Sequence, residues 1–272
     1  MMSFPFVREI RSIVRGEHVP ASRATPGSAR SGPGGYPVSL DGQIDPAASR
    51  WLWLIKFVLV IPHALVLCLL WIAVTVLTVV AGVSILFTGR YPPAIFAFNT
   101  GVMRWTWRVT FYTTASFATD RYPPFSLAPD AGYPADLDIE YPGRLSRGLV
   151  LVKWWLLALP HLIIVGILAG GWGFGWPGGW RIAGAGGLIA VLAVVAAVIR
   201  AVKGRYPPAL FDLIMGLNRW CYRVLAYVAL MTDQYPPFRL DPGGTDRAHR
   251  PPPGPPTWPL SVSGPIGPRS IG

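Results

Sequence analysis

Two histidines each follow a proline inside an apolar run, and their side chains could take part in chemistry. His63 follows Pro62, and His161 follows Pro160. An imidazole in an apolar environment could relay a proton or bind a metal ion. No intramembrane cluster of carboxylates or thiolates accompanies them, so the favoured interpretation is that each histidine caps carbonyls freed by its proline or ties two helices together. We therefore expect an intramembrane polar pair, and we assign no catalytic residue, metal ligand or cofactor.

Four arginines form a second group that could bind a ligand or form ion pairs, and they recur in a repeated aromatic segment. They are Arg104, Arg108, Arg219 and Arg223. In the second segment Asp212 lies seven residues before Arg219, on the same helical face. The guanidinium groups could hold phosphates of anionic lipids in bidentate geometry. Equally, they could form internal ion pairs, with Asp212 next to Arg219 and with Asp120 or Asp233 next to another arginine.

Two lysines also recur at equivalent positions. Lys56 and Lys153 each lie about one and a half turns into an apolar helix. A flexible lysine stem at that depth can reach the membrane surface, so we expect both amines to extend to the interface.

The composition is typical of a membrane protein. Hydrophobic residues make up 52% of the 272 residues and charged residues only 14%, whereas soluble domains carry roughly 25% charged residues. This composition argues against a soluble enzyme. The net charge of +11 is attributed to membrane topology and contact with anionic phospholipid headgroups, and we expect no nucleic-acid partner.

The elements that must position these residues belong to a tandem duplication. The motif GRYPPA occurs at 89–94 and 204–209, and TDRYPPF at 119–125 corresponds to TDQYPPF at 232–238. YPVSLD at 36–41 likewise corresponds to YPADLD at 133–138. Ordered repeats of about 100 residues indicate two pseudosymmetric modules.

Four regions follow from this duplication. Residues 36–130 form the first membrane repeat and residues 131–240 the second. Residues 1–35 and 241–272 are basic or proline- and glycine-rich tails, and their compositions predict disorder.

The motifs GRYPxxxF, RWxxRVxxY and TDxYPPF, in this order, resemble those of an uncharacterised bacterial membrane-protein family of unknown function. The resemblance covers both repeats. It implies an integral membrane protein and brings no activity, substrate, cofactor or catalytic residue.

Each repeat is expected to contain a transmembrane hairpin. In the second repeat, apolar residues 148–169 and 188–203 flank the glycine- and tryptophan-rich loop 170–187. In the first repeat, 37 almost wholly apolar residues, 51–87, would be about 55 Å long as one helix, nearly twice the hydrocarbon core. We place a turn near Trp71–Ile72. The alternative is a kinked single span whose residues 50–61 lie at the interface.

The third segment of each repeat, 94–118 and 209–231, carries the arginines. Arginine with tryptophan, phenylalanine and tyrosine suits the headgroup boundary. If these segments lie flat, the chain has four spans, whereas if they cross it has six and the second repeat is inverted. The charge asymmetry favours four spans with both termini in the cytoplasm.

The expected fold class is therefore an all-α polytopic membrane protein, in which each repeat has a transmembrane hairpin and an amphipathic Arg/Trp helix. The favoured function is a non-enzymatic scaffold or accessory protein of the bacterial cell membrane that contacts anionic lipid or a membrane protein partner. The alternative is a small pseudosymmetric transporter or permease.

Overall fold

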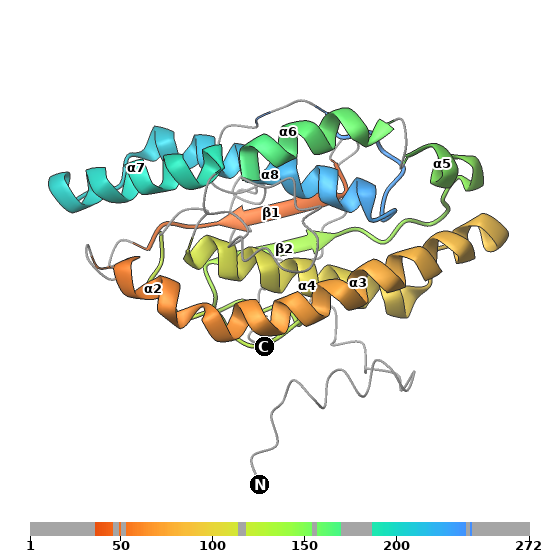
Figure 1. Cartoon of the computed structure of the whole chain (residues 1–272), viewed down its shortest axis with the longest axis horizontal. Helices are drawn as coiled ribbons and strands as arrows, with labels where there is room; N and C mark the ends of the chain where they lie inside the picture. Colours follow the sequence, from red (N-terminus) through yellow and green to blue (C-terminus); the bar gives the residue numbers. More distant parts are fainter. Residues whose placement is uncertain are drawn as a thin grey trace, which may run out of the picture.

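A computed structural model of the chain describes residues 36–45, 49, 53–113, 118–153, 157–169, 187–237 and 240. Two short strands lie between two layers of helices (Figure 1). The two predicted tails, and the glycine-rich loop up to residue 186, lie outside the described residues.

The two repeats supply similar elements in the same order. The first repeat contains β1 (Val38–Gly42), α2 (Trp53–Leu59), α3 (Ile61–Thr88) and α4 (Pro93–Tyr112). The second contains β2 (Ala135–Ile139), α5 (Arg147–Val152), α6 (Leu159–Ala169), α7 (Leu188–Lys203) and α8 (Pro208–Val228).

The repeated GRYPP motif ends one helix and begins the next. Gly89 and Gly204 follow α3 and α7 with φ of 71° and 74°, the left-handed conformation that glycine adopts without a steric penalty. Prolines then occupy the first turns of α4 and α8, where the missing N–H has no helical partner to lose. The motif therefore produces a sharp corner between two helices in each repeat.

The strands pair antiparallel across the two repeats. Leu40 is opposite Leu137, and these are equivalent positions of YPVSLD and YPADLD. A pairing of equivalent residues in antiparallel strands places a local twofold axis between them. The duplication is therefore a structural symmetry whose centre is the strand pair.

Each strand packs against the long buried helix of the other repeat. Helix α4 packs on β2, and α8 packs on β1 (Figure 1). Because a short two-stranded ribbon is marginally stable alone, this exchange provides the tertiary packing that it needs. Each repeat therefore covers the strand of the other, and the two repeats form one folded unit.

The predicted all-α polytopic class is wrong. Among the described residues there is a two-stranded sheet, and one helix, α3, is long and apolar enough to cross a membrane. The multi-pass topologies of four or six spans are therefore not supported. The strands were missed because their period-two alternation, Val-Ser-Leu-Asp and Ala-Asp-Leu-Asp, is only about four residues long.

The predicted hairpin turn at Trp71–Ile72 is also wrong, because α3 continues without interruption from Ile61 to Thr88. The break lies earlier, between α2 and α3, where Pro62 occupies the first turn of α3. In the second repeat the run 148–169 is not one α-helix, since α5 ends at Val152, Lys153 and Leu157 are π-helical, and α6 begins at Leu159.

The third segments do not lie at the surface as predicted. Helices α4 and α8 are the central helices of the fold, and most of their side chains are buried. Their arginines are buried with them, because the polar groups of the strands accept their hydrogen bonds. The same Arg/Trp pattern that suits a headgroup boundary thus also suits a polar core.

Candidate functional site

Three pairs of buried cations recur at equivalent positions of the two repeats. We call these residues the buried cation cluster: Lys56, Arg104, Arg108, Lys153, Arg219 and Arg223. Charged side chains are almost never fully buried unless they are paired, so each member requires an account of its partners.

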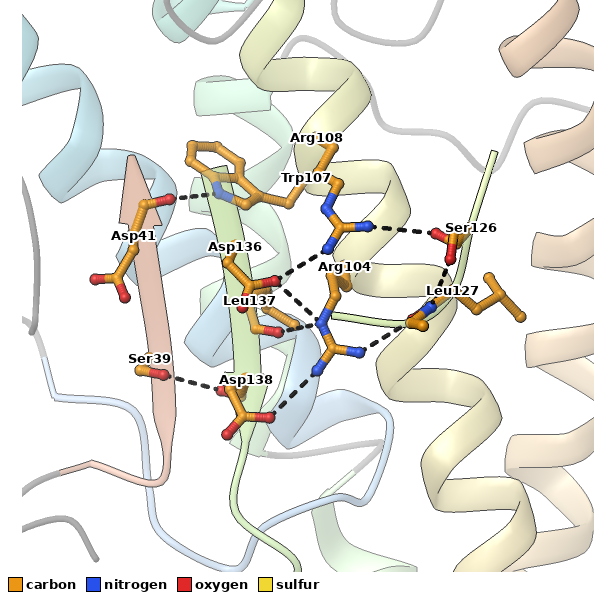
Figure 2. Close-up of polar contacts among 11 residues, drawn as sticks. Ser39, Asp41, Arg104, Trp107, Arg108, Ser126, Leu127, Asp136, Leu137 and Asp138 are labelled. Atoms are coloured by element: carbon orange, nitrogen blue, oxygen red, sulfur yellow. Dashed lines mark hydrogen bonds and ion pairs between the residues drawn. The ribbon is translucent and has the colours of Figure 1, made fainter. Parts of the chain in front are cut away.

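Arg104 connects α4 to the strand of the other repeat (Figure 2). Its Nε donates to the carbonyl oxygen of Leu137 at 2.7 Å and lies 3.2 Å from Asp136 Oδ1. One terminal nitrogen donates to the Leu127 carbonyl at 3.0 Å, and the other is 3.3 Å from Asp138 Oδ1. The planar guanidinium therefore fixes a helix, a strand and a loop at once.

Arg108 lies one turn further along α4 and shares a carboxylate with Arg104. Its Nη2 is 3.3 Å from Asp136 Oδ1, and its Nη1 donates to the carbonyl of Ser126 at 3.4 Å (Figure 2). Burial lowers the pKa of Arg108 from its usual value, and the charge of Asp136 opposes that effect. Asp136 thus compensates two buried positive charges.

The second repeat reproduces this arrangement with one difference. Arg219 Nε donates to the carbonyl of Leu40 at 3.2 Å, as Arg104 does to the equivalent Leu137. The position equivalent to Asp136 is Ser39, and Arg223 lies over the ring of Tyr36, 5.6 Å from its centroid. Arg223 therefore has a cation–π contact, and the serine at position 39 supplies no carboxylate equivalent to that of Asp136.

The two lysines occupy matching sites, and neither extends to the surface as predicted. Lys56 Nζ donates to the Thr119 carbonyl at 2.6 Å and lies 3.0 Å from Asp120 Oδ1. Lys153 Nζ donates to the Thr232 carbonyl at 2.7 Å and to Asp233 Oδ1 at 2.5 Å. Burial lowers the pKa of both lysines, and the paired aspartates oppose this shift.

Further contacts complete each lysine site. Each ammonium lies over a tyrosine ring, Tyr112 at 4.9 Å and Tyr227 at 4.8 Å from the centroid. The backbone N–H of Ser146 donates to Asp233 at 2.6 Å, and that of Ser49 donates to Asp120. The Thr-Asp pair of the TDxYPPF motif therefore supplies a carbonyl and a carboxylate to a buried lysine.

The aromatic residues of the same motif enclose the two histidines. His63 stacks on Phe125 with ring centroids 3.9 Å apart, and Trp105 Nε1 donates to His63 Nδ1 at 3.2 Å. His161 stacks on Trp220, the equivalent of Trp105, at 5.7 Å. Each imidazole therefore lies among aromatic rings of its own repeat.

A proton on Nε2 is implied for His63, because its Nδ1 accepts the indole hydrogen bond. In the second repeat, the hydroxyl of Tyr235 lies 3.4 Å from Nδ1 of His161. Within the described part of the chain, no three histidine, cysteine or acidic side chains form a metal-binding group.

The carboxylates that compensate the arginines differ from those expected. Asp120 and Asp233 contact lysines, and Asp212 is half-buried near the start of α8, outside the arginine contacts of the described residues. Sequence reasoning missed Asp136 and Asp138. Their spacing of two residues in YPADLD, which puts both on one face of a strand, is the signal that could have identified them.

The geometry defines a structural cluster. Its cations are buried against carboxylates, carbonyls and rings, and it joins secondary-structure elements from both repeats. The fold and the cluster together define the class of this protein: it has a tandem-duplicated, mainly helical fold with buried ion pairs at its centre.

One family model matches the chain, and its description is "Domain of unknown function (DUF4389)". It matches residues 50–126 and 182–239, one segment in each repeat, which fits two copies of the domain. No curated protein and no solved structure matches the chain.

Proposed function

We propose that this protein is a non-enzymatic accessory or scaffold protein of the membrane, and that its outer helices contact the bilayer. The observation that carries this proposal is an inverted distribution of side chains. The buried cation cluster, His63 and His161 lie inside, whereas many large aliphatic side chains of α3, α6 and α7 face outwards. Water favours the opposite arrangement, and a hydrocarbon solvent favours this one.

Helix α3 carries the longest outward apolar surface. Leu69 is 68% exposed and Phe87 73% exposed. The outer stripe has members mostly three or four residues apart, with two adjacent pairs near its end: Ile61, Leu65, Leu69, Ile72, Val76, Val79, Val80, Val83, Leu86 and Phe87. We call this the α3 stripe. It runs the full length of the helix, beyond the scattered apolar exposure that is normal for soluble proteins.

The dimensions and charge of α3 suit a bilayer. Its 28 residues would be about 42 Å long, compared with a hydrocarbon core of about 30 Å. The helix contains no lysine, arginine, aspartate or glutamate. Its one ionisable side chain besides cysteine, His63, is buried on the opposite face.

A second apolar surface lies on the opposite layer of helices (Figure 1). Its exposed side chains come from α6 and α7. They are Leu159, Leu162, Ile163, Ile167, Leu188, Val191, Val194, Val195, Val198 and Val202. These side chains give the second repeat an outward apolar surface of its own.

Lipid contact through the four repeated arginines is not part of this proposal. Arg104, Arg108, Arg219 and Arg223 are buried and face protein groups, so phosphate oxygens cannot replace those partners without opening the fold. No described observation favours transport over bilayer contact, and we propose no second function.

Flotation of the full-length protein with phosphatidylcholine vesicles tests the proposal. The double variant Leu69→Glu/Val76→Glu places two charges on the α3 stripe, and Pro129→Glu/Ala131→Glu places two on an exposed loop as a matched control. We expect the wild type and the loop variant to float, and the stripe variant to lose most of its vesicle-bound fraction. Circular dichroism in detergent checks that all three proteins are folded.

A milder pair of substitutions provides a second test if the glutamate variant does not fold. Leu69→Ser/Val76→Thr adds two hydroxyl groups without charge, and we expect it to bind more weakly than wild type. If the wild type remains with the lipid-free fraction, or if both stripe variants float like wild type, bilayer contact through α3 is excluded.

A further inference from the structure

Three exposed arginines lie together where the α3 stripe ends. Arg90 follows Gly89 at the end of α3, Arg144 lies just before α5, and Arg147 is the first residue of α5. All three side chains are exposed. Figure 1 shows α5 beside the C-terminal end of α3, so residues far apart in the sequence are neighbours here.

Backbone contacts hold the two segments together. The N–H of Leu145 donates to the carbonyl of Gly89 at 3.0 Å. A Cβ atom built on Gly89 would lie 3.7 Å from Arg147 Nε, so this guanidinium reaches the end of α3. Arg90 and Arg144 are each adjacent in sequence to one of the two hydrogen-bonded residues. The three arginines therefore share one small region.

Apolar, aromatic and basic side chains occur together at this end of the protein. Val83 and Phe87 are exposed apolar side chains of the last turns of α3. Tyr141 is 43% exposed, and its hydroxyl donates to the carbonyl of Tyr91, the residue after Arg90, at 2.5 Å. This combination of apolar, aromatic and basic groups is typical of the boundary between the hydrocarbon core and the headgroups of a bilayer.

The three guanidinium groups are available to bind an anionic ligand. Among the described residues, none of them forms an ion pair or a side-chain hydrogen bond. The neighbouring carboxylate, Asp233, is already held by Lys153 and by the Ser146 N–H. The net charge of +11 adds a general attraction to anionic surfaces.

We propose that Arg90, Arg144 and Arg147 form a binding site for the phosphate of anionic phospholipid headgroups. The proposal rests on the proposed bilayer contact, since the α3 stripe brings these arginines to headgroup depth. Arginine suits this ligand because its planar fork can donate two hydrogen bonds to one phosphate.

The test compares vesicles of phosphatidylcholine alone with vesicles that also contain phosphatidylglycerol. We expect the full-length protein to prefer the anionic vesicles, and the preference to weaken as salt is added. The variant Arg90→Gln/Arg144→Gln/Arg147→Gln should lose the preference by about fivefold per arginine, on the order of a hundredfold in total. Its binding to neutral vesicles should not change.

Two further variants separate a phosphate site from other roles of these arginines. The variant Arg90→Lys/Arg144→Lys/Arg147→Lys keeps the charge and loses the fork, so it should keep only part of the preference; a preference equal to that of wild type would show that charge alone is recognised and would overturn the phosphate site. Arg121→Gln removes an exposed arginine whose side chain donates to Gly132, and it should behave like wild type.

The outcomes distinguish this site from the bilayer contact itself. Failure of the wild type to bind any vesicle overturns the proposed function. Binding to both vesicle types with equal affinity, or an unchanged preference in the glutamine variant, overturns the headgroup site alone. If inorganic phosphate displaces the protein from anionic vesicles more effectively than chloride of equal ionic strength, the site takes free phosphate and the lipid assignment is wrong.

Discussion

Leu40 and Leu137 lie opposite each other at the centre of the strand pair, and each carbonyl oxygen accepts a hydrogen bond from an arginine of the other repeat. Arg104 reaches from the first repeat to the second, and Arg219 reaches back. Each repeat therefore fixes the strand of the other. This reciprocal contact explains why the arginines recur at equivalent positions and why they are buried.

Replacement of Arg104 should destabilise the protein severely. Arg104→Gln leaves Asp138 without its guanidinium partner, leaves Asp136 with Arg108 alone, and removes the hydrogen bond to Leu137. Loss of one partner of a buried ion pair costs about 3–5 kcal/mol, and Asp138 is exposed enough to place the expected loss near the lower figure. The exposed control Arg121→Gln should cost less than about 1 kcal/mol. Guanidinium unfolding in detergent measures both, and equal midpoints would contradict the assigned role.

The Lys153–Asp233 contact should show strong energetic coupling. Asp233→Asn leaves an ammonium group buried with less compensation, and we expect a loss of about 3 kcal/mol. Lys153→Met keeps most of the apolar stem. The double variant should therefore lose less stability than the sum of the single variants, by about 1–3 kcal/mol.

A double-mutant cycle built on unfolding free energies measures this coupling. Asp212→Asn serves as the control, because Asp212 is half-buried and lies outside the buried cation cluster. Additive effects of the Lys153 and Asp233 substitutions would show that the contact contributes no net energy.

Substitution of Gly101 should loosen the loop that Arg104 holds. A Cβ atom at Gly101 would lie 2.8 Å from Leu127 Cβ and 3.1 Å from the Leu127 oxygen, which accepts from Arg104. We expect Gly101→Ala to cost about 1–3 kcal/mol, because this loop must move. At Gly143 a Cβ atom would meet nothing within 4 Å, so Gly143→Ala should be nearly neutral. Thermal unfolding of the two alanine variants compares them, and a neutral Gly101→Ala would refute the close approach.

Stability should fall in alkaline solution as buried tyrosines ionise in the unfolded chain. Burial raises the pKa of Tyr91 from 10.0 to about 12, and it also raises the pKa of Tyr36 and Tyr133. The folded protein then holds more protons above pH 10, so stability present below pH 10 is lost as the pH rises towards 12. Each such group contributes a slope of about 1.4 kcal/mol per pH unit.

Tyr91→Phe isolates one of these tyrosines. The stability of this variant should decline less steeply than that of wild type between pH 10 and 12, by the contribution of one group. The lowered pKa of Lys56 and Lys153 acts in the opposite sense, since stability then rises with pH up to the ordinary lysine value of 10.5. Unfolding curves at several pH values check the difference in slope, and parallel curves would contradict the shift at Tyr91.

The amino-acid sequence by itself identified the duplication, its repeated motifs and the outermost helices. These features are local: apolar runs predict helices, and the GRYPP motif predicts a corner, whatever the rest of the chain does. It also indicated that Arg104, Arg108, Arg219 and Arg223 belong to one repeated arrangement. It left open whether lipid or protein groups compensate them.

Only the tertiary structure decided that question. The partners of Arg104 and Arg219 come from strands about 33 and 179 residues away, in the opposite repeat. Period and composition predict which face of an element is apolar, but they do not specify which element covers that face. A Trp- and Arg-rich helix therefore fits equally well at a headgroup boundary or against Asp136 and Asp138. The exchange of strands between the repeats selects the second arrangement, because it brings both carboxylates within ion-pair distance of the arginines.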